Sequence, residues 1–334
     1  VRWYYQFVHH DLWDYDLPAQ PIVTDLTHEG NSIPAVVQLT KQGMVFAFNR
    51  ITGEPLFEIE ERPVPQSSDD PRASLSPTQP FSEIALVQQG MTPEDAWGFT
   101  FWDRNACKKR IESLRSEGTY TPPSEQGSIV MPASAGGMNW GGGAVMPGSD
   151  ILIVPTLHMA QVHRLVPRET DSPETRGPYF YFPMEGTDYL AEISFLTSPL
   201  GAPCTEPPWG RLSAVDLSSG EVLWQVPLGS IEMLAEQTIG LPIPLEMGTP
   251  MAGGPIVTKG GIAFIAATAD DKFRAFDIET GTKLWETELP AGGQATPMTY
   301  SVDGTQYVVI MAGGHPYYGT TKGDHIVAFK LKDA

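Results

Sequence analysis

The feature that most constrains the fold is a short repeat with alanine, aspartate, glycine and tryptophan at constant spacing. It occurs as AVDLSSGEVLW at 214–224 and as AFDIETGTKLW at 275–285. A weaker copy, AFNRITGEPLF at 47–57, has asparagine and phenylalanine in place of the aspartate and tryptophan, and the chain ends on a truncated copy, AFKLKDA. Self-similarity of this kind is typical of repeat architectures, so each copy is expected to mark one structural unit.

Each copy predicts a strand, a tight turn and a return strand closed by an aromatic residue. The glycine supplies the positive φ of the turn, and the aromatic ring can bury about 150 to 250 Å² against the neighbouring unit. Gly-rich segments with apolar strands precede the copies. We therefore predict an all-β chain, a partial β-propeller of about four to five blades with loop and helical insertions. The expected blades are 1–62, 128–226, 248–289 and 290–334, and the expected insertions are 63–127 and 168–209.

Composition agrees with many short strands. The 334 residues include 33 glycines and 31 prolines, which are scattered rather than periodic and therefore read as turn residues. One segment departs from this pattern. Residues 92–118 carry a threonine cap, early acids and a glycine stop, which predicts one or two short helices.

Charge and cysteine content exclude some classes. Forty acids against 21 bases give a net charge of -19, which repels nucleic acid and anionic membrane surfaces. No apolar run reaches the ~18 to 20 residues that cross a bilayer. Cys107 and Cys204 fit neither a zinc cluster nor a haem attachment motif, and the sequence leaves open one disulfide or two buried thiols.

The segment HHDLWDYD, residues 9–16, reads in three ways: a metal cage, a catalytic site or an acidic turn between strands. On a strand, His9 and His10 would point to opposite faces and could not share a metal ion. Asp14 and Asp16 would share a face. Taken alone, these eight residues favour the acidic turn.

The repeat resembles the tryptophan-docking motif of propeller quinoproteins, which carry pyrroloquinoline quinone (PQQ). The runs HHDLWDYDLPAQP, FIAATAD, LPAGGQATPMTY and QYVVIMAGGH are more narrowly similar to the membrane-bound glucose and quinate/shikimate dehydrogenases. The resemblance implies that 1–334 is the C-terminal portion of an eight-bladed catalytic domain whose membrane anchor and first blades lie outside this sequence. It also implies open propeller edges, through which such a piece could self-associate.

The resemblance also implies site residues. Asp14 matches the catalytic base, which takes the proton of a substrate hydroxyl. The residues matched to cofactor binding are Lys41, Asn139, Trp140, Asp270 and His315. A Ca²⁺ or Mg²⁺ ion is implied beside PQQ, but the ligands are not assigned; Asp14 and Asp16 are the candidates within this chain. Without the resemblance, Lys41 reads as a lysine solvating a turn, and His315 as a structural histidine.

The implied function is oxidation of a hydroxyl of a sugar or cyclic polyol acid such as glucose, quinate or shikimate. PQQ would accept the hydride, and electrons would pass to ubiquinone through the anchor at the periplasmic face of the bacterial inner membrane. The piece alone is expected to be inactive. The alternatives are a non-catalytic propeller scaffold with the same blade motif and a PQQ alcohol dehydrogenase carrying haem. The absence of Cys-x-x-Cys-His counts against a haem domain within this chain.

Overall fold

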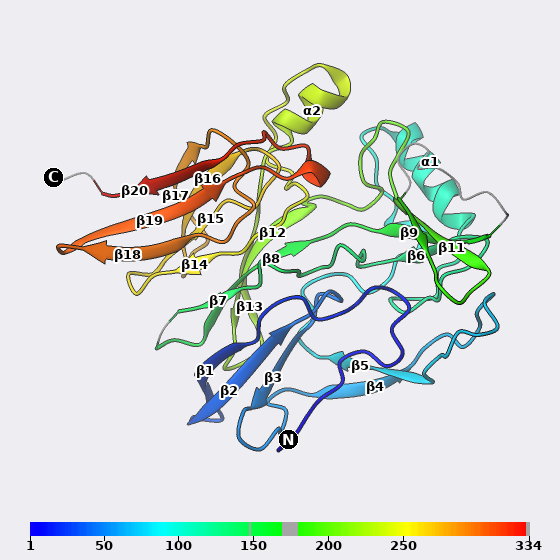
Figure 1. The fold of residues 1–334 in the computed structure, drawn as a ribbon, viewed down its shortest axis with the longest axis horizontal. Coiled ribbons are helices and arrows are strands. Elements are labelled where there is room, and N and C mark those ends of the chain that lie inside the picture. Colours follow the sequence, from blue (N-terminus) through cyan, green and yellow to red (C-terminus); the bar gives the residue numbers. More distant parts are fainter. Residues whose placement is uncertain (147, 169–179, 332–334) are drawn as a thin grey trace.

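The computed structural model describes residues 1–146, 148–168 and 180–331, and it is mostly β, as predicted (Figure 1). Its strands form six small antiparallel sheets. Residues 169–179 of one expected insertion and the last three residues of the truncated repeat lie outside the described residues. None of the helices in the described ranges is both long and apolar enough to cross a membrane.

Four sheets follow one another along the chain and contain the repeats. The first is β1 (Ile22–His28), β2 (Asn31–Leu39) and β3 (Val45–Asn49); the second is β7 (Ala144–Val145), β8 (Ile151–Leu157), β12 (Gly210–Asp216) and β13 (Val222–Pro227). The third is β14 (Ile256–Val257), β15 (Ile262–Ile265), β16 (Lys272–Asp277) and β17 (Lys283–Glu288); the fourth is β18 (Met298–Val302), β19 (Thr305–Ala312) and β20 (His325–Phe329). Strand β7 contacts both β1 and β14, so the first three sheets lie side by side at their inner strands.

The two tryptophan-containing copies confirm the predicted strand, turn and return strand. The copy at 47–57 has the strand and the turn, but only a single bridge between Phe48 and Pro55 stands in place of the return strand. In each copy the glycine amide donates to the backbone oxygen at the aspartate or asparagine position, at 2.7 to 2.9 Å; these pairs are Gly53–Asn49, Gly220–Asp216 and Gly281–Asp277. The two tryptophan-containing copies also share a β-bulge directly after the alanine. The repeat therefore fixes hydrogen bonding and register as well as the turn.

The aromatic residue of one repeat packs on the turn glycine of the next. The indole of Trp224 donates its Nε1 hydrogen to Ile278 O at 2.8 Å, and a Cβ at Gly281 would lie 2.7 Å from its ring. Gly281 has φ +71, which favours glycine, and the Trp224 ring leaves no space for a Cβ atom at this position. This contact joins the second sheet to the third.

Two further contacts follow the same rule. Phe57 packs on Gly220 and joins the first sheet to the second. Trp3, which the repeat pattern did not identify, packs on Gly53 and donates its Nε1 hydrogen to Arg50 O at 3.1 Å. Trp3 therefore takes the place of a docking aromatic from a unit preceding the first sheet.

The two repeat tryptophans differ in burial: Trp224 is half-buried against the third sheet, whereas Trp285 is exposed. Its side chain is 37% exposed, and its ring rests on Phe273 and on Phe329 of β20, with ring centroids 5.8 and 5.2 Å away. In the truncated copy, the position that corresponds to the docking glycine is occupied by Ala334, which lies outside the described residues.

A separate layer is built from the segments between the blades. Strand β6 (Ser128–Val130) pairs with β9 (Gln161–Pro167), and β10 (Phe180–Pro183) and β11 (Tyr189–Phe195) complete this sheet in the order β10-β11-β9-β6. A two-stranded sheet, β4 (Ile59–Pro63) with β5 (Thr78–Ser82), and helices η1 (Pro93–Asp95) and α1 (Phe101–Glu112) precede it. Later in the chain come α2 (Glu232–Ile239) and η2 (Pro316–Tyr318).

This layer differs from the boundaries expected from sequence. Residues 128–130 join the inserted sheet rather than the second blade, and the chain leaves that blade after Leu157 and returns at Gly210. The reason is that β8 and β9 are consecutive strands with a short link, so sequence alone does not show that they belong to different sheets. The expected short helices within 92–118 are confirmed by η1 and α1.

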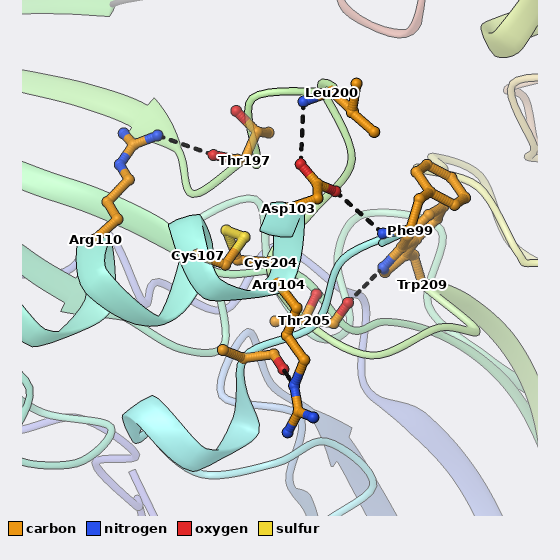
Figure 2. Close-up of a disulfide and its surroundings, with 11 residues drawn as sticks. Phe99, Asp103, Arg104, Cys107, Arg110, Thr197, Leu200, Cys204, Thr205 and Trp209 are labelled. Carbon is orange, nitrogen blue, oxygen red and sulfur yellow. Dashed lines mark hydrogen bonds between the residues drawn. A yellow bond between two sulfur atoms is a disulfide. The ribbon is translucent and has the colours of Figure 1, made fainter. Parts of the chain in front are cut away.

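A disulfide closes the inserted layer (Figure 2). Cys107 of α1 is bonded to Cys204 across 97 residues, which resolves the choice between a disulfide and two thiols. Beside it the buried carboxylate of Asp103 accepts hydrogen bonds from the backbone amides of Phe99 and Leu200, at 3.1 and 3.3 Å. Two distant segments of the chain are thus held together at one end of α1.

The docking contact can be tested at Gly281. The Gly281→Ala variant forces a β-carbon against the Trp224 ring, whereas Gly304→Ala has the same kind of positive φ (+78) and no atom within 4 Å of the new carbon. Both variants carry backbone strain, so the difference between them isolates packing. We expect Gly281→Ala to lower the free energy of unfolding by about 1 to 3 kcal/mol more than Gly304→Ala. Equal losses in denaturant unfolding would show that the ring does not dock there.

The disulfide should stabilise the layer by restricting the unfolded chain. We expect Cys107→Ser with Cys204→Ser to lower the free energy of unfolding by about 2 to 5 kcal/mol, because the bond closes a long loop. Denaturant titration of the full-length protein, with and without reductant, measures it. If the variant and the reduced native protein unfold at different midpoints, the loss does not come from the disulfide.

Candidate functional site

A buried lysine meets two exposed acids beside the first sheet. The Nζ of Lys41 donates to the backbone oxygen of Asp14 at 2.7 Å, to Asp14 Oδ2 at 3.1 Å and to Asp16 Oδ1 at 2.6 Å. The lysine side chain is 7% exposed, while the side chains of Asp14 and Asp16 are 67% and 57% exposed. An ammonium group has three protons, so all of its donors are used. The structure thus brings together three of the residues singled out from sequence.

Residues 9–16 form a loop rather than a strand, so the argument that Asp14 and Asp16 share one strand face does not apply. No strand is present there, and Asp14 has φ +63, in the left-handed region. A non-glycine residue in that region costs about 1 to 2 kcal/mol. The hypothesis that the two histidines form part of a metal site is not supported either, because the His9 ring contacts the carboxylate of Glu61 at 3.0 Å. The acids converge through this strained turn rather than through strand periodicity.

The residues on either side of Asp14 are buried aromatics. Trp13 is 2% exposed and donates its Nε1 hydrogen to Thr121 O at 2.8 Å. Tyr15 is fully buried and donates its hydroxyl to Pro132 O at 2.5 Å. Both acceptors belong to the inserted layer. Sequence reasoning missed this arrangement; the alternation of Trp, Asp, Tyr and Asp was the signal that could have shown it.

Opposing effects act on the pKa of Asp14. Partial burial raises it most strongly, the hydrogen bond and charge of Lys41 lower it, and Asp16 raises it; the net result is a pKa above its usual value. Burial also raises the pKa of Asp11, and the charge of Asp14 adds to that rise. A carboxyl group with a raised pKa that is still partly open to solvent is suited to accept a proton.

Asn139 and Trp140 follow directly on this cluster. The amide of Gly137 donates to Lys41 O at 2.6 Å, so this Gly-rich segment runs beside the lysine. The side chain of Asn139 is engaged locally: its Oδ1 accepts from the Trp140 amide at 2.7 Å, and its Nδ2 donates to Ala135 O. Trp140 is 77% exposed, so it is not a docking aromatic between sheets.

Close contacts continue from this segment to the later sheets. Gly141 is packed so tightly on Gly253 that a Cβ would lie 2.0 Å from its oxygen, and Gly253 in turn lies against Gln294. Gln294 accepts a hydrogen bond from Thr320 at 3.1 Å, and Thr320 accepts from the amide of His315 at 2.7 Å. These contacts lead from the Lys41 cluster to the C-terminal sheet. A cavity of about 20 Å³ lies beside Gly141 and Gly253.

Asp270 is buried and fully engaged with protein. Its Oδ1 accepts from Thr268 at 2.6 Å and from Arg274 at 3.2 Å, and its Oδ2 accepts from the Ser230 amide at 2.8 Å and from Arg274. Burial raises the pKa of Asp270, but the hydrogen bond and charge of Arg274 outweigh it and hold the pKa below its usual value. Asp270 therefore joins the loops of the second and third sheets and has no oxygen free to contact a ligand.

The surroundings of His315 differ from those of Asp270. It caps η2, and its ring lies near those of Tyr317 and Tyr318, with centroids 5.5 and 5.0 Å away. Its Nδ1 is buried without a hydrogen-bond partner. A buried ring nitrogen without a partner is destabilising unless something supplies one, so His315 is suited to contact a bound group.

Metal ligands are not evident. In the described part of the chain, no three His, Cys, Asp or Glu side chains are placed to hold one ion. His158 and His163 are buried, and burial lowers their pKa values to about 3 and about 4. They are neutral at physiological pH.

Comparison with protein families gives a match over residues 1–308, to the PQQ family described as the glucose/ethanol/alcohol dehydrogenase β-propeller domain. Among curated relatives, the quinoprotein glucose dehydrogenase of Escherichia coli is 43% identical over 342 residues, covering 100% of this chain and 43% of that protein. The quinate/shikimate dehydrogenase (quinone) of Acinetobacter baylyi is 37% identical, covering 99% and 42%. This chain thus spans less than half the length of these relatives.

Solved structures show the same fold. The quinohemoprotein alcohol dehydrogenase from Comamonas testosteroni aligns with a TM-score of 0.58 and 20% identity, covering 98% of this chain and 40% of that one. A europium-containing methanol dehydrogenase aligns with a TM-score of 0.56 and 23% identity, covering 93% and 42%. The predicted fold, part of a quinoprotein propeller, is confirmed.

The effect of Lys41 on Asp14 can be measured directly. The Lys41→Met variant removes the charge and hydrogen bond that favour the carboxylate, so the pKa of Asp14 should rise further above its usual value. Lys259→Met removes an exposed lysine from a hairpin turn and should leave that pKa unchanged. Carboxyl ¹³C NMR titration, assigned with Asp14→Asn, reports the value. A fall in pKa on Lys41→Met would contradict the contact.

Proposed function

Because the chain belongs to the PQQ-dependent glucose/ethanol/alcohol dehydrogenase β-propeller family, we propose that it forms part of the active site of a quinoprotein that oxidises a sugar or cyclic polyol hydroxyl. The observation that carries the proposal is the pairing of buried Lys41 with exposed Asp14 and Asp16. Since the chain covers 43% of its glucose dehydrogenase relative, the activity is proposed for the full-length protein.

The residues present fit PQQ, a flat, carboxylated ortho-quinone. The exposed indole of Trp140 offers a face for stacking, and the unpartnered Nδ1 of His315 offers a hydrogen-bonding atom. Lys41 supplies the nearby cation, which favours negative charge on quinone oxygens. When bound, PQQ supplies a two-electron acceptor for the hydride that leaves the substrate carbon. Asn139 is proposed to line the same pocket, and Asp270 to hold the loops around it.

Asp14 is the proposed base. Its carboxylate takes the hydroxyl proton of the substrate, so that the C–H bond can break with the electron pair departing as hydride. Lys41 favours the ionised form of Asp14, because its charge and hydrogen bond lower the pKa that burial raises. The remaining exposure of Asp14 lets the proton pass on to solvent after each turnover.

The substrate, electron acceptor and location are proposed from the relatives. They include a glucose and a quinate/shikimate dehydrogenase, so the proposed substrates are glucose, quinate or shikimate and the products a lactone or ketone. We further propose electron transfer to ubiquinone, Ca²⁺ or Mg²⁺ beside PQQ, and a periplasmic location. The Cys107–Cys204 disulfide supports that location, because such bonds persist in oxidising compartments.

A scaffold function is less well supported. A scaffold needs the docking aromatics Trp3, Phe57 and Trp224, but it has no use for a buried lysine that holds two exposed acids in a strained turn. Strain of this kind persists where the surrounding structure enforces it, which is typical of functional sites.

The test is Asp14→Asn in the full-length protein reconstituted with PQQ and Ca²⁺ or Mg²⁺. Asparagine tolerates the left-handed backbone but cannot accept the proton at neutral pH, so turnover should fall about 10² to 10⁴-fold while PQQ binding is kept. Dye reduction with glucose, quinate and shikimate measures it.

Asp303→Asn is the matched control. Asp303 is also an aspartate in the left-handed region, with φ +49, but it lies in the turn between β18 and β19. This variant should retain turnover. If Asp14→Asn keeps near-normal activity, Asp14 is not the base; if the native protein reduces dye with none of the three substrates, the substrate class is wrong.

A further inference from the structure

We propose that Trp13 and Tyr15 are positioning residues for the Asp14 carboxylate, and that the inserted layer, through Thr121 and Pro132, holds the base in place. The inference rests on the proposed function of Asp14. It extends that function by giving the inserted layer a part in the reaction, although none of the layer's own residues is proposed to touch substrate.

The geometry places one anchor on each side of the base. Trp13 and Tyr15 are the immediate neighbours of Asp14, and each reaches more than a hundred residues along the chain to a backbone oxygen. Both side chains point into the protein, where their rings lie against Tyr120 with centroids 5.1 and 6.0 Å away. With both neighbours fixed inward, the residue between them is held at φ +63 with its side chain at the surface, against Lys41.

The acceptors are themselves held firmly. Thr121 closes a tight turn, in which its amide and hydroxyl both donate to Gly118 O, at 3.2 and 2.7 Å, and its hydroxyl oxygen accepts from the Glu117 amide at 2.8 Å. The residues flanking Pro132 are bonded through their backbones: Met131 O accepts from Gly90 at 2.9 Å, and the Ala133 amide donates to Met159 O at 2.9 Å. Rigid acceptors can fix the position of a flexible loop.

Lys41 alone does not fix the carboxylate. Its Nζ bonds only one carboxylate oxygen of Asp14, because its three protons are divided among that oxygen, the backbone oxygen of Asp14 and Asp16. The charged groups around the base are Lys41, Asp16 and Asp11. A shift of the loop would move Asp14 relative to these three charged groups without removing any of the groups. The displaced base should therefore lower kcat, while the binding of substrate and PQQ is retained.

The experiment compares two tryptophans in the full-length holoenzyme. Trp13→Phe and Trp209→Phe each remove a buried indole that donates to a backbone oxygen at 2.8 Å, and the two residues are 2% and 3% exposed. Both variants should lose similar stability in denaturant unfolding. Only Trp13→Phe should lower kcat, by about 10 to 100-fold, with KM and PQQ affinity changed less than about twofold. Equal kcat in the two variants would overturn the proposal.

A second readout does not depend on activity. Hydrogen–deuterium exchange with mass spectrometry should show peptide 9–18 exchanging at least several-fold faster in Trp13→Phe and in Tyr15→Phe than in the native protein or Trp209→Phe. Tyr15→Phe, which loses a single oxygen, serves if Trp13→Phe fails to fold. Unchanged exchange in both variants would refute positioning. Faster exchange combined with full activity in Asp14→Asn would instead refute the proposed base and leave the anchoring intact.

Discussion

The fold depends on one contact, an aromatic ring laid on the turn glycine of the next repeat. Trp3, Phe57 and Trp224 each make it, and the two tryptophans add a hydrogen bond to the backbone beside the glycine. The contact is specific because a β-carbon at the glycine would occupy the place of the ring. This contact fixes the first sheet to the second and the second to the third near their outer hairpins. At the inner ends, the Gly-rich segments of these sheets meet in close contacts such as that of Gly141 with Gly253.

The repeats could be predicted from sequence because the interactions that form each repeat are local. Turn glycine, acidic turn residue and closing aromatic lie within one hairpin, so a fixed spacing carries the information. The inserted layer was not readable in this way. Ser128–Val130 pairs with Gln161–Pro167 rather than with the adjacent strand Ile151–Leu157. The choice between these two strands is made by long-range pairing, which a pattern within one segment does not show.

The same distinction between local and long-range interactions applies to the candidate site. Asp14, Lys41 and Asp16 were named in the sequence analysis and lie together in the structure. The long-range part of this loop could not be predicted, since Trp13 and Tyr15 find their hydrogen-bond partners in a distant segment. Asp270 could be located from sequence, but its closed set of partners could not, because Arg274 and Ser230 reach it from separate sheets.

The inserted layer also bears on the order of events as the chain leaves the ribosome. Strand β8 ends at Leu157, but its partner β12 begins only at Gly210, and Cys107 must wait for Cys204. During that interval an apolar strand and a thiol are available to wrong partners. Because the chain emerges from its N-terminus, there is a period in which the first blade can already fold while the second blade still lacks a strand. A chaperone that binds the β8 segment would protect this segment most during that period.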